Sequence, residues 1–192
     1  MIALKNTPEK AQSLLTEQFF YFFLRVRKSQ VRKVVDAVNN RYPEETLEQR
    51  ARRLISAQTA LSFLGGTILH LPLFIPGLGQ VLKFIGVVGG ASALTRMHLY
   101  LILEIALLYG KNIDDEERVP EMVAVVLATG AAAGAPFLFN LLDLNPLYSL
   151  PVAGVAASSV AQIMGETAIR FYGQKQQELI AASEMPLLNP SA

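Results

Sequence analysis

Hydrophobic positions dominate four long stretches of this chain, at residues 54–71, 80–109, 120–135 and 151–172. Each stretch is long enough for a helix, and none has the strict apolar/polar alternation of a half-buried strand. Prolines and glycines separate the members of each pair, and these residues interrupt helices. The pattern predicts two apolar helical hairpins, which pair 54–71 with 80–109 and 120–135 with 151–172. We therefore expect an all-α fold, a bundle of apolar helical hairpins.

The N-terminal part of the chain is more polar and predicts two helical segments. Thr7 and Pro8 fit an N-cap followed by proline at the first helical position, which predicts a helix over 7–39. A second helix is expected to begin near residue 43 and to continue into the first apolar stretch, ending near residue 70. The expected fold is thus a hairpin bundle with an N-terminal amphipathic helical arm.

Two glycines and the changes of composition divide the chain further. Gly110 and Gly173 follow apolar helices and are placed to end them as C′ glycines. The residues after Gly173 are typical of a fraying helix end followed by a flexible terminus. The predicted organisation is a basic amphipathic arm at 1–53, an apolar helical-hairpin domain at 54–175 and a flexible tail at 176–192.

Charge is concentrated in the arm. Residues 1–53 contain 11 Lys/Arg and 6 Asp/Glu, whereas residues 54–192 contain 6 and 10. No charged residue lies between Arg53 and Lys83, and Asp143 is the only charged residue from 122 to 165. A helix exposed to water normally has a polar stripe opposite its apolar one, and these segments have Thr, Ser, Gln and Gly instead. The distribution favours association with a membrane.

The apolar segments are short for crossing a bilayer, which takes about 20 apolar residues. Residues 54–71 offer 18, residues 77–95 offer 19 with Lys83 among them, residues 122–135 offer 14 and residues 151–165 offer 15. We therefore expect hairpins that dip into the bilayer, or short tilted spans. A compact bundle docked on the membrane is the alternative.

Composition narrows the class of protein. Hydrophobic residues make up 52% of the chain and charged residues 17%, with no cysteine. The composition excludes disordered, collagen-like and charged coiled-coil proteins, and the lack of cysteine excludes disulfides, thiolate metal sites and a cysteine nucleophile. The first strongly apolar run, 19–24, is too short and too late for a secretory signal, so we expect a location on the cytoplasmic side.

Small residues recur at intervals of four in the apolar helices. Residues four apart stack on one helix face, and small ones allow two backbones to approach closely, as in membrane helix pairs. A tight soluble core would use the same pattern. The expected helix-packing positions are Gly86, Gly90, Gly130, Gly134, Ala153, Ala157, Ala161 and Gly165.

The arm is the clearest candidate for binding, because aromatic residues stand directly before basic ones. Aromatic rings favour the headgroup region of a bilayer, and cations there meet anionic lipid phosphates. An amphipathic helix with core aromatics and solvated charges would have a similar pattern. Nucleic-acid binding is disfavoured because the basic patch stands alone. The expected membrane- or partner-binding residues are Phe19, Phe20, Phe22, Phe23, Arg25, Arg27, Lys28, Arg32 and Lys33.

Residues with catalytic or metal-binding potential do not form a recognised motif. His70 and His98 lack metal-ligand spacing, and each is expected to be a hydrogen-bonded buried or interfacial residue. Asp114 and Glu117 have capping-box-like spacing at the start of a predicted helix, which is preferred to a divalent-ion site. No cofactor or metal is therefore expected, and we predict that the protein is not an enzyme.

Four charged residues interrupt the apolar segments, namely Lys83, Arg96, Glu104 and Asp143. Arg96 and Glu104 are eight residues apart, two turns on one helix face, and could share a polar cluster with His98 or Tyr100. A structural ion pair is the expected role, because an unpaired charge in an apolar layer is costly. A buried Arg96/Glu104/Asp143 site would instead indicate an enzyme.

Part of the chain resembles the EcsC family. The apolar helix that ends in Leu108-Tyr109-Gly110 is followed by Asp114-Asp115-Glu116-Glu117-Arg118, similar to the D-D-x-x-R connector of that family. The stretch from residue 150 to residue 172 resembles a related membrane domain appended to some bacterial GTPases. The resemblance covers about residues 54–175 and implies a helical, membrane-associated bacterial module without established catalysis, sometimes linked to transporters or GTPases.

The expected function is that of a non-catalytic, membrane-associated accessory or scaffold protein that binds lipid, a membrane protein partner, or both. A protein partner or a homo-oligomer is expected besides lipid, and nucleic acid is not. The main alternative is a soluble helical module that holds a lipid or another apolar ligand in a cavity between helices.

Overall fold

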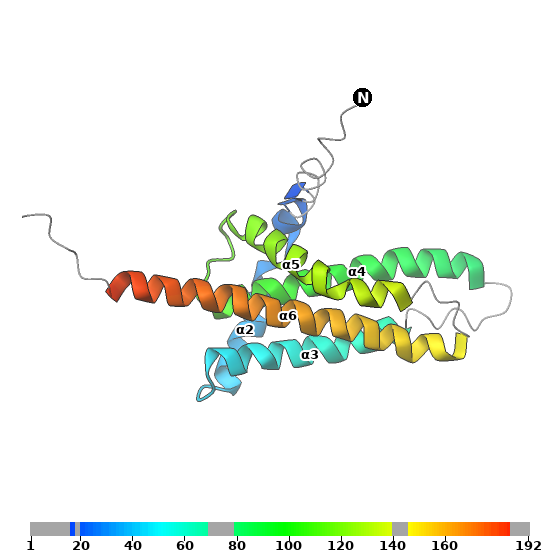
Figure 1. Cartoon of the computed structure of the whole chain (residues 1–192), viewed down its shortest axis with the longest axis horizontal. Coiled ribbons are helices and arrows are strands. Elements are labelled where there is room, and N and C mark those ends of the chain that lie inside the picture. Colours follow the sequence, from blue (N-terminus) through cyan, green and yellow to red (C-terminus); the bar gives the residue numbers. More distant parts are fainter. Residues whose placement is uncertain (1–15, 18–19, 69–78, 140–145, 185–192) are drawn as a thin grey trace, which may run out of the picture.

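The computed structural model describes residues 16–17, 20–68, 79–139 and 146–184 (Figure 1). Residues 20–25 are helical and are followed by five longer helices, α2 (Lys28–Arg41), α3 (Leu47–Ile68), α4 (Gly79–Leu108), α5 (Arg118–Phe139) and α6 (Pro146–Glu184). No strand occurs in these ranges. The predicted all-α bundle is confirmed.

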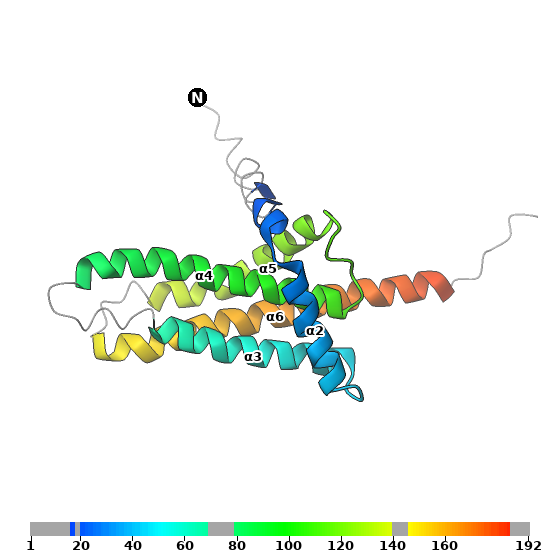
Figure 2. The ribbon, with the colours of Figure 1, turned by 180° about the vertical axis from the view of Figure 1, so that it is seen from behind.

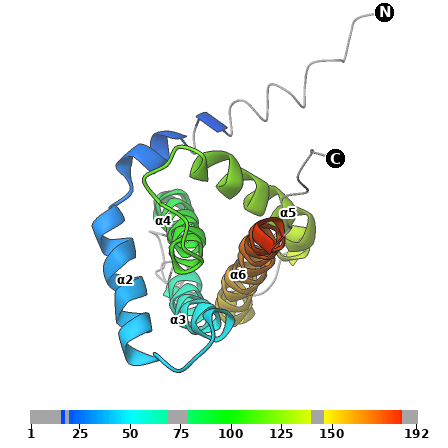
Figure 3. The ribbon, with the colours of Figure 1, turned by 90° about the vertical axis from the view of Figure 1, so that its left-hand side faces the viewer.

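Helices α3, α4 and α6 form the long axis of the bundle, and α2 runs across it (Figure 2). The view along the axis shows α2 on the outside of α3 and α4, with α5 beside α6 (Figure 3). The predicted partners α3 and α4 are in contact, and so are α5 and α6. The most extensive packing, however, joins α3 to α6, which belong to different predicted hairpins.

Local sequence explains where α3 begins and where α4 ends. Thr46 and Gln49 form a capping box at the start of α3, in which Gln49 N donates to Thr46 Oγ1 (3.2 Å) and Thr46 N donates to Gln49 Oε1 (2.8 Å). Gly110 has φ +75°, and the N–H groups of Gly110 and Lys111 donate to the carbonyls of Leu107 and Ala106. This is a Schellman end, so the prediction for Gly110 is confirmed.

Several predicted boundaries were wrong. The first helix is interrupted at Val26 and Arg27 instead of running over 7–39, of which residues 1–15 lie outside the described part. Helix α6 begins at Pro146 and continues through Gly173 to Glu184, so Gly173 does not end it and residues 176–184 are helical. Helix α5 likewise continues past Pro136 to Phe139. Contacts distant in sequence explain two of these differences, since Arg27 N donates to Tyr100 Oη at the break and Lys175, just past Gly173, contacts Glu121 of α5.

One hydrophobic core joins the arm to the remainder of the bundle. Phe23, Val31 and Val35 are almost fully buried and belong to the same cluster as Leu54 and the 101–106 stretch of α4. The proposed boundary after Arg53 lies inside α3, which continues across it without a break. The arm therefore packs as part of the bundle from Phe23 onward.

The two ends of the bundle differ in charge. The C-terminal parts of α3 and α5 and the N-terminal parts of α4 and α6 lie together at one end, which we call the apolar end (Figures 1 and 2). Their sequences contain the charge-free interval between Arg53 and Lys83 and most of residues 122–165. Within the described ranges, no helix is both long and apolar enough to cross a membrane.

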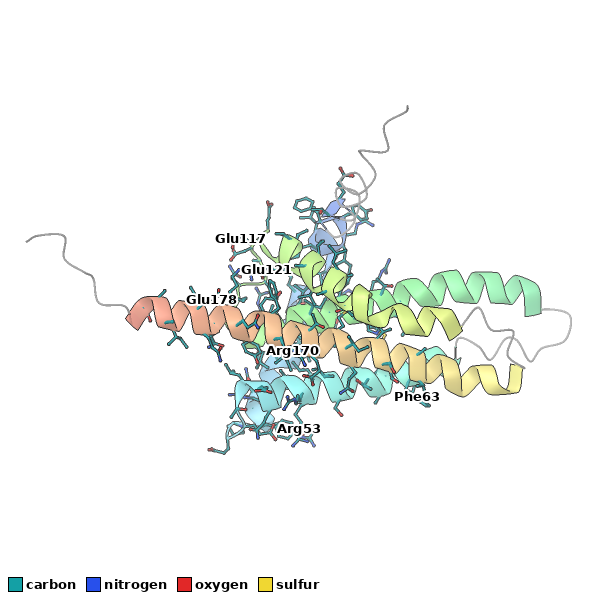
Figure 4. All side chains as sticks on the ribbon, in the orientation of Figure 1. Arg53, Phe63, Glu117, Glu121, Arg170 and Glu178 are labelled. Carbon is teal, nitrogen blue, oxygen red and sulfur yellow. The ribbon has the colours of Figure 1, made fainter. Side chains whose placement is uncertain are left out.

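The labelled side chains follow this division. Arg53, Glu117, Glu121, Arg170 and Glu178 lie over the middle of the bundle and towards the C-terminus of α6, whereas Phe63 lies towards the apolar end (Figure 4). Large apolar side chains are exposed on the helices of the apolar end, namely Leu61, Phe63, Leu64, Leu127 and Val155.

Candidate functional site

A break in the arm places arginine side chains against α4. Arg27 has non-helical backbone angles (φ −79°, ψ 78°), and its N–H donates to Tyr100 Oη at 3.1 Å. Phe22 packs edge-to-face on the Tyr100 ring, with centroids 5.9 Å apart. Tyr100 therefore fixes both the end of the 20–25 helix and the start of α2.

A cavity of about 610 Å³ lies between this part of the arm and α4. Its walls combine aromatic rings, guanidinium groups and one carboxyl group. The residues that line it are Tyr21, Phe22, Arg25, Arg27, Gln30, Val31, Arg96, Tyr100 and Glu104.

The basic residues of the arm fall into two groups. Lys28 and Arg32 form ion pairs with Asp114, that of Lys28 at 3.4 Å, and so fasten α2 to the connector before α5. Arg25 and Arg27 line the cavity instead, and in the described part of the chain neither forms an ion pair. The Arg25 guanidinium stacks 4.0 Å from the centroid of Tyr21.

Glu104 brings a carboxyl group to the cavity from α4. Burial raises the pKa of Glu104 to about 7, so the group is close to half protonated at neutral pH. The predicted cluster of Arg96, Glu104 and Tyr100 is present as lining of one cavity. The expected Arg96–Glu104 ion pair is not formed among the described side chains. Asp143 lies outside the described residues.

His98 belongs to the core instead of the cavity. Its side chain is buried, and Nε2 shares a hydrogen bond of 3.3 Å with Ser62 Oγ of α3. Burial lowers the pKa of His98 to about 4. The predicted hydrogen-bonded, buried histidine is confirmed here, whereas His70 lies outside the described residues.

These two groups of α4 give opposite pH dependences of stability. The folded state binds the Glu104 proton more tightly, so Glu104 lowers the free energy of unfolding as the pH rises from about 4.5 to 7. The unfolded state binds the His98 proton more tightly, so His98 lowers the free energy of unfolding as the pH falls from about 6.5 to 4.

Without the Glu104 carboxyl group, the pH dependence of stability should follow the titration of His98. Between pH 4.5 and 6.5 we expect the unfolding free energy of Glu104→Gln to increase with pH more steeply than that of the wild type, by about 2 kcal/mol over the interval. Thermal unfolding followed by circular dichroism across this range measures it, with Glu116→Gln on the exposed connector as the control. Parallel pH profiles of wild type and Glu104→Gln would contradict the placement of this carboxyl group.

The predicted binding residues of the arm are distributed between core and surface. Phe23 is 1% exposed and contacts Lys28 Nζ (4.2 Å from the ring centroid), so it is a core residue and its predicted place at a membrane-facing surface is wrong. Phe22 is half-buried against Tyr100, and Phe20 and Lys33 are exposed. Phe19 lies outside the described residues.

Exposed apolar side chains flank the cavity. Phe20, Tyr21 and Leu24 are 37%, 55% and 64% exposed, and Arg25 follows directly. Leu24 and Tyr21 were absent from the predicted set, although the period of the 20–25 helix puts them on its outer side once Phe23 is buried.

The predicted small-residue positions differ in their surroundings. A Cβ atom on Gly165 would lie 2.7 Å from Ile55 Cδ1 and closer still to Cγ1. Helices α6 and α3 are therefore so close at this point that only glycine fits. Ala161 is buried and Ala157 half-buried on the same helix. Gly130 is exposed, and a Cβ atom added to it would have nothing within 4 Å, so it is not a close contact. The surroundings of Gly86, Gly90, Gly134 and Ala153 lie outside the described side chains.

The acidic connector has a different role from the predicted helix cap. Helix α5 begins at Arg118, and the Asp114 carboxylate faces Lys28 and Arg32 of α2, so the capping box of Asp114 with Glu117 is wrong. Asn112 Oδ1 accepts from Asp114 N at 3.1 Å, which shapes the turn. In the part of the chain that the structure describes, no group of three or more acidic or histidine side chains could hold a metal ion.

Sequence reasoning missed a buried ionic network at the start of α5. The side chains of Arg118 and Glu121 are 5% and 8% exposed and form an ion pair, and Lys175 Nζ of α6 lies 2.5 Å from Glu121 Oε1. Burial and the nearby Glu121 carboxylate raise the pKa of Tyr172. The spacing of three between Arg118 and Glu121 was the available signal, since such residues face each other on a helix.

Comparison of the chain with family models, with curated proteins and with solved structures finds no match in any of the three. The resemblance to the EcsC family, and the activity and partners that it implies, stay predictions.

Proposed function

We propose that this protein is a non-catalytic, membrane-associated accessory or scaffold protein that binds lipid through its apolar end and its arm. The observation that supports this most is the division of charge along the bundle, with exposed large apolar side chains on the helices of the apolar end. Leu61 and Leu64 of α3 are 53% and 55% exposed, and no charged residue follows them until Lys83. Exposed apolar surface of this kind favours a membrane or a protein partner over water.

The position of the arm agrees with this orientation. The arm crosses the bundle at Tyr100, and α4 extends from there to Gly79, about 30 Å at 1.5 Å per residue. From Leu54 to Ile68, α3 covers about 20 Å by the same rise. The first length is about equal to the thickness of the hydrocarbon core of a bilayer, which is about 30 Å, and the second is shorter. With the apolar end in the bilayer, the arm would lie at headgroup level.

The side chains at the arm suit that level. Phe20, Tyr21 and Leu24 offer exposed apolar surface, and Arg25 and Arg27 offer positive charge beside it. Aromatic rings and arginines are favoured where hydrocarbon meets headgroups. We infer an attachment to the cytoplasmic face, where anionic lipids attract such residues, and a membrane protein or a second copy of the chain as a further partner.

The experiment uses two pairs of exposed apolar residues at opposite ends of the bundle. We expect Leu61→Ser/Leu64→Ser to reduce the fraction of protein that floats with phospholipid vesicles about tenfold or more. About half of each leucine side chain is exposed, and its transfer from water into the bilayer is favourable. Leu179→Ser/Ile180→Ser, whose side chains are 58% and 50% exposed near the C-terminus of α6, should float like the wild type.

The outcomes separate the candidate functions. Equal losses in both pairs of variants would contradict insertion of the apolar end. A wild-type protein that stays with the buffer fraction and carries bound lipid would instead support the soluble lipid-binding alternative, for which the cavity between the arm and α4 is the specific observation.

A further inference from the structure

Three arginines from two separate elements line the cavity between the arm and α4. Arg25 and Arg27 come from the junction before α2, and Arg96 comes from α4, about 70 residues later. Among the described residues none of the three forms an ion pair, although Lys28 and Arg32 of the same arm are both paired with Asp114. All three arginines are exposed and line the same cavity, so they give it a positive potential that attracts an anion.

The chemistry of the walls identifies the type of anion. Guanidinium groups match the oxygens of phosphate in bidentate geometry, and three arginines line this cavity. Tyr100 Oη accepts a hydrogen bond from Arg27 N, and its O–H group can still donate a hydrogen bond to a ligand. The rings of Tyr21 and Phe22 add an apolar wall, which suits the carbon atoms next to a phosphate ester.

The surroundings indicate where this phosphate comes from. Phe20, Tyr21 and Leu24 are exposed around the same helical turn as Arg25. A freely soluble phosphate has no need of exposed apolar side chains beside its site, whereas a lipid headgroup is reached only from the bilayer surface. We propose that the cavity binds the phosphate of an anionic membrane lipid, with Arg25, Arg27 and Arg96 as its ligands. This proposal rests on the membrane association proposed above.

Glu104 gives the site a dependence on pH. The titratable and charged groups that line the cavity with it are Arg25 and Arg27 of the arm, Tyr21, and Arg96 and Tyr100 of α4. With its pKa raised to about 7, Glu104 is mostly protonated at pH 6 and mostly ionised at pH 8. The protonated acid can donate a hydrogen bond to phosphate, whereas the carboxylate repels it.

The test compares two double variants with the same change of net charge. Arg27→Gln/Arg96→Gln removes two proposed ligands, and Arg41→Gln/Arg170→Gln removes two exposed arginines that do not line the cavity. The measured quantity is the preference of the protein for vesicles of phosphatidylcholine with phosphatidylglycerol over vesicles of phosphatidylcholine alone. We expect this preference to fall about tenfold or more in the first variant, because each basic residue contributes about 1 kcal/mol at an anionic surface. The second variant should retain it.

Four outcomes would overturn one proposal or the other. Wild-type protein that floats with neither vesicle contradicts the proposed membrane association. Wild-type flotation with an unchanged lipid preference in Arg27→Gln/Arg96→Gln, or equal losses in both double variants, contradicts the headgroup site alone. Saturation of the protein by glycerol phosphate or inorganic phosphate without vesicles, at a concentration that also abolishes flotation, would assign the site to a soluble phosphate.

Binding of Glu104→Gln at two pH values tests the same site without removing an arginine. Glu104→Gln should bind the anionic vesicles severalfold more tightly than the wild type at pH 8 and equally at pH 6, because only the ionised carboxylate opposes the phosphate. An equal effect at both pH values, or no effect at either, would contradict the contact of Glu104 with the bound anion. Circular dichroism of each variant confirms that the helices are formed.

Discussion

Glu121→Ala should be the most destabilising single substitution of a charged residue that we consider, at about 3–5 kcal/mol of unfolding free energy. The side chains of Arg118 and Glu121 are both less than 10% exposed, so the substitution leaves a buried guanidinium without its carboxylate. Lys175 also loses its contact at 2.5 Å, although its side chain is 42% exposed and can turn to water. Because folded domains are stable by about 5–15 kcal/mol, this loss is a large share.

The matched control is Glu117→Ala, which removes the other carboxylate near Arg118. Glu117 lies 3.4 Å from Arg118 Nη2 but is 81% exposed, so we expect a change below about 0.5 kcal/mol. Guanidinium unfolding followed at 222 nm measures both variants. Equal effects of the two substitutions would show that the Arg118–Glu121 pair is not buried as described.

Gly165→Leu should destabilise the protein by about 3 kcal/mol through overpacking between α6 and α3. Even a Cβ atom at Gly165 would come within 2.7 Å of Ile55 Cδ1, and Ile55 is 3% exposed in the core. The branched Cβ of Ile55 restricts the rotamers by which it could move away. The gain in helix propensity from replacing glycine, at most about 1 kcal/mol, does not compensate.

The control substitution lies at Gly130, another glycine of the predicted packing set. Gly130 has open space around it on α5, so Gly130→Leu should leave the stability unchanged or increase it by up to about 1 kcal/mol. Chemical unfolding of Gly165→Leu, Ile55→Ala and the double variant completes a cycle, in which we expect the double variant to lose less than the sum. Additive losses, or equal effects at Gly130 and Gly165, would contradict close packing at Gly165.

Those parts of the fold that depend on local signals could be predicted from the sequence. Gly110 ends α4 because glycine adopts positive φ at little cost, and α4 and the C-terminal end of α3 lie at nearly the expected bounds. Gly173 follows a similar Tyr-Gly pair but lies inside α6, two residues before Lys175, which contacts Glu121 of α5. The same local signal therefore has two outcomes, which tertiary contacts decide.

The candidate site depends on contacts that are distant in sequence. The break at Arg27 is fixed by Tyr100, 73 residues away, and a pattern within the arm does not contain this information. The arm's basic residues looked equivalent in sequence, yet Asp114 engages Lys28 and Arg32 and leaves Arg25 and Arg27 at the cavity. The spacing of Arg96 and Glu104 did indicate a shared polar cluster, because both residues lie on one helix.

The most direct measurement of the proposed insertion is the depth of single labelled positions in vesicles. The chain contains no cysteine, so Leu64→Cys in the apolar end and Glu178→Cys near the C-terminus of α6 each provide one site for an environment-sensitive fluorophore. We expect the label at residue 64 to shift to shorter emission wavelengths with vesicles and to be quenched by bromine on the lipid acyl chains, while the label at residue 178 stays accessible to aqueous iodide. Equal exposure of both labels to iodide in vesicle-bound protein would contradict insertion of the apolar end.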